Sequence, residues 1–243
     1  FFSETKKGDL NAQVLQLELL ANNFNQSLDL APLFKELARR LSDSGDTAGA
    51  PGPELKKRLD VSAATLIYKQ VTSLGRRGYV KEASVPLANW EKDFGKPFID
   101  ERIPFSRISP LVVAGAREAT PMVRFRVEVI DVNIALHEVE VRLRVDLPGG
   151  AEQDVDRHFW VSPYDFPMLD NTQLPYGLRC SVVITDFFVP DGPAADREAN
   201  SFVKFHLVVF PAASASFKER QDYDDVLLDM LRSSSRPAAS EGA

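Results

Sequence analysis

The chain has few of the residues that build disulfides and metal sites. It contains one cysteine, Cys180, and three histidines, His137, His158 and His206, which lie far apart in the sequence. A single cysteine cannot form an intrachain disulfide, and no two histidines have the spacing of a metal site. Cys180 alternates with apolar residues in LRCSVVI, which predicts a core residue and not a nucleophile. We therefore expect no metal and no cofactor.

Long apolar runs and an excess of positive charge are also missing. No stretch of about 18 apolar residues is present, so we expect no contact with a membrane. Lys and Arg total 29 against 35 Asp and Glu, which gives a net charge of -6. Because proteins that coat nucleic acid are normally basic, any nucleic-acid contact must be a local patch. The chain starts FFSETKKGDL, without Met or a signal-peptide pattern. We interpret it as a fragment or processed form of a cytoplasmic protein.

The common catalytic motifs are absent. The chain has no G-x-S-x-G, no phosphate loop of the G-x(4)-G-K-[ST] type and no G-x-G-x-x-G. A nuclease-like strand would place Lys soon after an acidic pair, but HEVEVRLRV supplies Arg, which cannot accept a proton. We therefore expect no catalytic residues and a protein that is not an enzyme.

The first part of the chain carries one continuous apolar stripe. Its members follow one another at spacings of 4, 3, 4, 3 and 4: Leu10, Val14, Leu17, Ala21, Phe24 and Leu28. This pattern predicts a heptad-patterned helix within residues 1–29, whose stripe must be covered by another apolar surface. Two covers are equally open. One is a second copy of the chain, which would make a homo-oligomer through residues 10–28. The other is the rest of the same chain.

Residues 54–83 resemble a winged helix-turn-helix. The apolar positions of that family fall on Leu55, Leu59, Ile67, Val71 and Leu74, and the run R-R-G-Y-V is a familiar ending for such a unit. The resemblance implies a second helix at 54–59, a turn at 60–62, a third helix from 63 to about 77, and a strand that starts at Tyr79. Leu33–Leu41 would supply the first helix, so the unit covers residues 30–85.

In DNA-binding members of this family the third helix enters the major groove and basic residues contact phosphates. The residues that the resemblance assigns to DNA are Lys56, Lys57, Arg58, Thr65, Tyr68, Lys69, Arg76, Arg77 and Lys81. Their local charge is positive although the whole chain is negative, which a DNA patch requires. Asp60 stands at a turn position where the family usually has Gly, and acidic residues follow the unit. A winged helix that contacts a protein partner is therefore the alternative.

The apolar pattern changes period after the helical part, which predicts an α+β fold. From Val123 on, apolar and charged residues alternate in VRFRVEVIDV and HEVEVRLRVDL, as is typical of strands with one buried face. We expect an N-terminal helical part with a winged helix, and a C-terminal antiparallel β-barrel or sandwich with a closing helix. The predicted boundaries are 86–105 for a linker, 106–232 for the β domain with its C-terminal helix, and 233–243 for a disordered tail.

The β part is also similar to a PilZ domain, the small β-barrel that binds cyclic di-GMP. ERIPFSRI places Arg102 before Arg107, where that family has an R-x-x-x-R element, and DVNIAL places Asp131 where it has a D/N-x-S-x-x-G turn. Here the two arginines are one residue further apart, and Leu136 replaces the Gly. The resemblance implies a ligand site at Arg102, Arg107 and Asp131, with the arginines on phosphates.

Two aromatic runs lie in the middle of the β part, His158-Phe159-Trp160 and Tyr164-Asp165-Phe166-Pro167. They predict core and edge packing in preference to a groove for a partner. Taken together, the sequence predicts a non-enzymatic, dimeric regulatory protein. It would bind DNA through the winged helix and use the β domain as a sensor or docking module. The alternatives are a protein-interaction subunit of a larger assembly and a cyclic di-GMP receptor.

Overall fold

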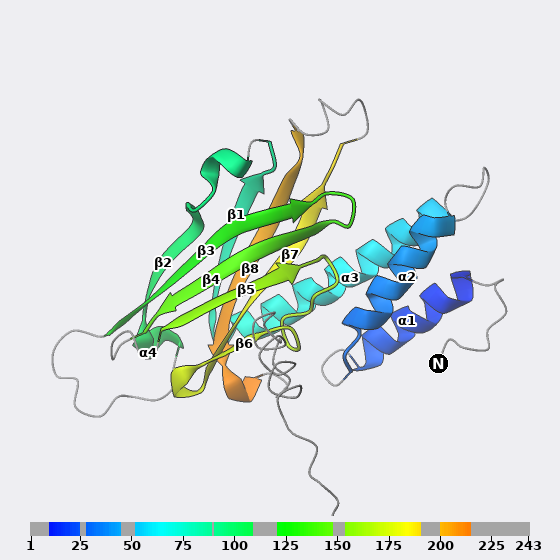
Figure 1. Cartoon of the computed structure of the whole chain (residues 1–243). Helices are drawn as coiled ribbons and strands as arrows, with labels where there is room; N and C mark the ends of the chain where they lie inside the picture. The colour runs from blue at the N-terminus through cyan, green and yellow to red at the C-terminus, as the bar shows by residue number, and fades with distance from the viewer. Residues whose placement is uncertain are drawn as a thin grey trace, which may run out of the picture.

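Two antiparallel sheets and a group of three helices are stacked in three layers (Figure 1). The computed structural model describes residues 10–24, 28–44, 52–88, 90–108, 121–147, 154–190 and 200–214. The predicted closing helix and tail lie outside these ranges. The expected α+β fold with an antiparallel β part is confirmed.

The helical layer consists of α1 (Leu10–Phe24), α2 (Ala31–Ser44) and α3 (Gly52–Gly75). The predicted stripe on α1 faces the other two helices, where Val14, Leu17 and Ala21 are at most 5% exposed. The same chain therefore covers the central part of the predicted stripe, whereas Phe24 and Leu28 at its C-terminal end are 48% and 41% exposed. Among the described residues, no helix has the length and apolarity needed to cross a bilayer.

Helix α3 is continuous where the resemblance placed a turn. The predicted break at 60–62 is wrong, since Gly52–Gly75 is one helix of 24 residues. No Gly or Pro occurs between Glu54 and Leu74. Leu59 and Ala63 are fully buried and extend one apolar stripe across the expected turn. The carboxylate of Asp60 forms an ion pair with Lys56, one helical turn earlier, at 2.7 Å. It also accepts a hydrogen bond from the hydroxyl of Tyr164.

Within the described ranges, eight strands form the two sheets, in the orders β1-β8-β7-β6 and β2-β3-β4-β5. Their bounds are β1 Tyr79–Pro86, β2 Pro97–Pro104, β3 Met122–Asn133, β4 Glu138–Asp146, β5 Val155–Val161, β6 Thr172–Leu174, β7 Leu178–Phe188 and β8 Phe202–Pro211. The short helical turns described between or after them are η1 Trp90–Asp93, α4 Phe105–Ile108, η3 Pro175–Gly177 and η4 Ala212–Ser214.

Two predicted boundaries do not separate domains. The strand expected at Tyr79 is present as β1, but it pairs with β8, so the unit 30–85 shares a sheet with the β part. The expected linker 86–105 contains β2, an edge strand of eight residues that pairs with β3. Prolines stand at both ends of β2, where an edge strand tolerates them. Gly78 joins α3 to β1 so close to β8 that a Cβ atom there would stand 2.0 Å from the carbonyl oxygen of Val209.

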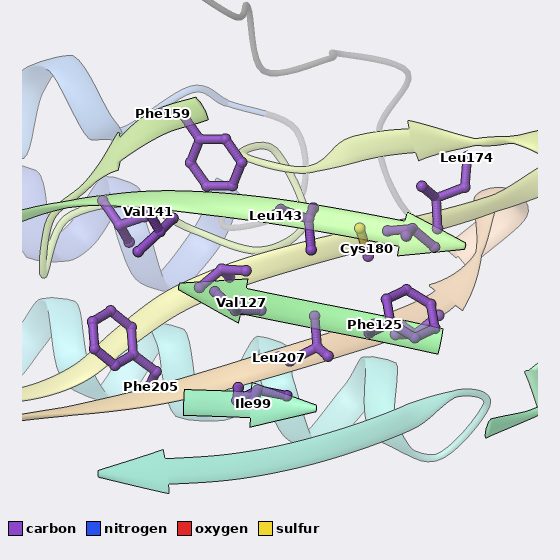
Figure 2. Packing of buried hydrophobic residues seen from close by; sticks show 14 of the residues in the cluster. Ile99, Phe125, Val127, Val141, Leu143, Phe159, Leu174, Cys180, Phe205 and Leu207 are labelled. Atoms are coloured by element: carbon purple, nitrogen blue, oxygen red, sulfur yellow. The ribbon is translucent and has the colours of Figure 1, made fainter. Parts of the chain in front are cut away.

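Alternation along the strands produces two apolar cores. The inward residues of both sheets, including Cys180, fill the sandwich (Figure 2). Cys180 is fully buried there, as predicted. On the other face of β7 and β8, Val183, Val208 and Phe210 pack against the helices and belong to the second core. The sheet β1-β8-β7-β6 is therefore the middle layer and is apolar on both faces where the helices cover it.

The segment 162–171, between β5 and β6, contacts the helical layer through side-chain packing and an ion pair. Phe34 of α2 packs on Tyr164 and Phe166, with ring centroids 6.0 and 5.3 Å away. Lys35 forms an ion pair with the buried Asp165 at 3.1 Å. The predicted packing role of the aromatic runs is confirmed for these two rings, while Trp160 in β5 is 41% exposed.

Candidate binding groove beside helix α3

A groove runs between α3 and the outer face of the middle sheet. It consists of two adjoining hollows of about 520 and 530 Å³, which share Val61, Ala64, Thr185 and Asp186. The first extends along α3 to Pro53, and the second reaches residues of β8 and β1. Helix α3 forms one wall, and strands β7, β8 and β1 form the floor. We call this feature the α3 groove.

The wall is formed by the side of α3 that points away from its buried stripe. Lys57, Val61, Ala64 and Tyr68 follow one another at spacings of 4, 3 and 4, so they lie along one face of the helix. Val61 is 59% exposed and Tyr68 is 71% exposed. Aromatic side chains are enriched at interface hot spots, and covering apolar surface is favourable.

The floor is polar because of a bulge in β7. The register between β7 and β8 shifts between Ile184 and Asp186, which places Asp186 opposite Lys204. Their charged groups are 3.4 Å apart. Because of the bulge, the charged side chain of Asp186 lies on the same face of β7 as the apolar Val183, three residues earlier.

His206 is the centre of the second polar group on the floor. Its Nδ1 lies 3.1 Å from the Thr185 hydroxyl, and its Nε2 lies 3.4 Å from the Glu82 carboxylate. Burial lowers the pKa of His206, and the nearby Glu82 opposes that shift. The polar side chains of the floor are therefore already paired with one another.

The closed end of the groove is built around Tyr164. Its hydroxyl donates to Asp60, and Lys56 lies 5.5 Å from the ring centroid. Burial, with the Asp60 charge, raises the pKa of Tyr164. His137 packs on Phe187 at 4.9 Å, and burial, together with the charge of Lys56, lowers its pKa. This end is a packed set of aromatic rings and ion pairs.

The structure separates the nine residues predicted to contact DNA into two sets. Three are paired with carboxylates inside the chain: Lys56 with Asp60, Arg58 with Glu18 and Lys81 with Glu101. The other cations, Lys57, Lys69, Arg76 and Arg77, are exposed. Tyr68 and Thr65 are exposed as well, and the Thr65 hydroxyl donates to the Val61 carbonyl.

The three residues of the PilZ resemblance do not come together. Arg102 pairs in register with Arg124 near the start of β3, while Asp131 lies seven residues further along the same strand. At about 3.3 Å per residue this separation is roughly 23 Å. Arg107 lies on α4, with its guanidinium 5.0 Å from the ring centroid of Tyr79. We therefore reject the predicted site at these three residues.

Sequence reasoning missed the floor of the groove. Glu82, Thr185 and His206 come from three strands that are distant in the sequence, so no local motif joins them. The sequence of β8 did contain one signal. On one face of this strand the polar residues Lys204 and His206 are followed by the apolar residues Val208 and Phe210. This change marks where the helical cover begins. Within the described ranges, no cluster of His, Cys, Asp and Glu could hold a metal ion.

Searches against protein-family models, curated proteins and solved structures found no match.

Proposed function

We propose that this protein is a non-enzymatic interaction module that holds a segment of a partner protein in the α3 groove. The observation that carries the proposal is the exposure of Val61 and Tyr68 on the wall of a groove. Because the floor groups pair with one another, an occupant gains mainly by covering this apolar wall.

The groove fits an amphipathic helix. The α3 residues that line it run from Pro53 to Tyr68, which corresponds to about 22 Å at 1.5 Å per residue. An occupying helix of about four turns would place apolar residues against Val61 and polar residues over the floor, as in other helix-in-groove complexes.

The test is selection from a phage-displayed library of helical peptides, followed by affinity measurement on the enriched peptide. We expect Val61→Asp to weaken binding at least tenfold, because a carboxylate on the wall would lose its hydration. Ser73→Asp adds the same charge at an exposed α3 position outside the groove and serves as the control. A library that yields no binder, or peptides that bind both variants equally, would overturn the proposal.

DNA binding is a second candidate, favoured by the exposed cations Lys57, Lys69, Arg76 and Arg77. Fluorescence anisotropy with random duplex DNA at two salt concentrations tests it. Affinity should fall steeply with salt, and Arg76→Ala with Arg77→Ala should reduce the log–log slope by about 1.8. Val61→Ala, which changes no charge, should leave both the affinity for DNA and its salt dependence unchanged. An absence of binding at low salt would remove this candidate.

A further inference from the structure

Two leucines on the outer face of α1 are exposed in the described structure. Leu15 and Leu19 lie four residues apart, so they share one side of the helix. This side points away from the buried stripe of Val14, Leu17 and Ala21. Leu15 is 48% exposed and Leu19 is 54% exposed. We call these two residues the α1 outer face.

Exposed apolar side chains are concentrated in this part of the chain. Four of the thirteen large apolar side chains that are exposed within the described ranges lie in residues 10–28: Leu15, Leu19, Phe24 and Leu28. Single exposed leucines are common on protein surfaces, but three large exposed apolar side chains on a helix of 15 residues are typical of a contact surface.

The same segment is nearly without charge. Although 26% of the whole chain is charged, residues 10–28 contain one charged residue, Glu18. Its carboxylate is paired inside the chain with Arg58, at 2.5 Å, and with the Ser62 hydroxyl. The exposed side of α2, by contrast, carries Lys35, Glu36, Arg39 and Asp43. Depletion of charge is a property of interface cores.

The absence of charge on this surface favours a second copy of the chain as the partner. A two-fold axis brings a surface against its own copy, so a face with one sign of charge would repel itself and a neutral face does not. A helix on a lipid surface would carry Lys or Arg beside its apolar face, and residues 10–28 have neither.

We propose that the protein forms a two-fold dimer in which the α1 outer face of one copy packs against that of the second. The dimer does not depend on the α3 groove, which lies beside α3 on the side of the middle sheet. Since the face is short, the interface belongs to the small class, and we expect a weak dimer that dissociates on dilution.

Sedimentation velocity from about 1 to 200 µM tests the proposal on the full chain. We expect mass to rise from monomer to dimer, and Leu15→Asp with Leu19→Asp to raise the dissociation constant at least tenfold. Both positions are exposed, and circular dichroism verifies that the double variant folds. Val61→Asp, which adds charge in the groove, should leave the dimer intact. A protein that stays monomeric at the highest concentration would overturn the proposal.

Crosslinking supplies an independent readout. Leu19→Cys treated with a short bismaleimide should give a covalent dimer, whereas Glu36→Cys on the exposed side of α2 should not. The native Cys180 is fully buried and does not compete. Equal crosslinking of both variants would contradict the proposed face. The double variant should keep its affinity for the selected peptide, so failure of the dimer and failure of the groove proposal are distinguishable.

Discussion

Phe34 is the residue that contacts the segment 162–171 most directly. Its side chain is fully buried and packs on the rings of Tyr164 and Phe166. We predict that Phe34→Ala lowers the free energy of unfolding by about 3 to 5 kcal/mol, because it removes an aromatic ring and leaves a cavity. Urea denaturation measures this loss. Glu36→Ala, which removes a solvent-exposed ion pair on the same helix, should leave the free energy of unfolding nearly unchanged. A loss below about 1 kcal/mol for Phe34→Ala would contradict the packing described.

Two histidines make stability depend on pH. Burial lowers the pKa of His137 and of His206, so the unfolded chain binds more protons than the folded chain as pH falls below 6.5. We predict a lower free energy of unfolding at pH 5.5 than at pH 7.5. The groups around them are Lys56 and Asp60 for His137, and Glu82 and Thr185 for His206.

Urea titrations at the two pH values measure the difference, which His137→Asn with His206→Gln should largely remove. Glu138 acts in the opposite direction, because burial raises its pKa and stability is lost as pH rises from 4.5 to that raised value. Glu138→Gln separates this contribution. Stability that is unchanged or higher at pH 5.5 in the Glu138→Gln background would refute the histidine effect.

Among the secondary-structure elements, the continuous helix α3 forms the wall of the groove. We predict that Val61→Pro costs about 3 kcal/mol or more, because proline removes a helical hydrogen bond and clashes with the preceding turn. Val61→Ala at the same exposed position should cost little. Urea denaturation with far-ultraviolet circular dichroism measures both variants. If Val61→Pro were as stable as Val61→Ala, the chain would have the turn at 60–62 that the family resemblance implied.

Elements with a long, regular pattern could be predicted from the sequence. The central stripe of α1 and the alternation in β3 and β4 are local, and each appears in the structure with the expected buried side, although Phe24 and Leu28 at the end of the predicted stripe are exposed. The turn at 60–62 came from the family resemblance and was wrong, because the residues themselves, without Gly or Pro and with Leu59 and Ala63 on one apolar stripe, form one helix. Prolines predicted a linker at 86–105, yet Pro97 and Pro104 stand at the ends of an edge strand. The groove floor has no local pattern, since β1, β7 and β8 meet only in the folded chain.

For the whole molecule, the shared second core predicts one cooperative unfolding unit. Helix α3 packs on β7 and β8, and the three helices share one apolar core with Val183, Val208 and Phe210 of the middle sheet, so neither layer keeps its core without the other. Both tryptophans, Trp90 and Trp160, lie in the β part, and circular dichroism at 222 nm reports mainly on the helices. We predict that urea transitions followed by these two signals coincide. Two separate midpoints would show that the layers unfold independently.

The pairing of β1 with β8 has a consequence for the order of events during synthesis. Tyr79 lies opposite Val209 and Pro86 lies opposite Phe202, so partners in one ladder are separated by more than a hundred residues. A ribosome adds about 5 to 20 residues per second, so β8 is synthesised at least roughly 6 s after β1. Strands β2 to β5 are consecutive and can pair as they emerge. The sheet β2-β3-β4-β5 can therefore form on the ribosome, while the middle sheet β1-β8-β7-β6, which supports the groove, must assemble last.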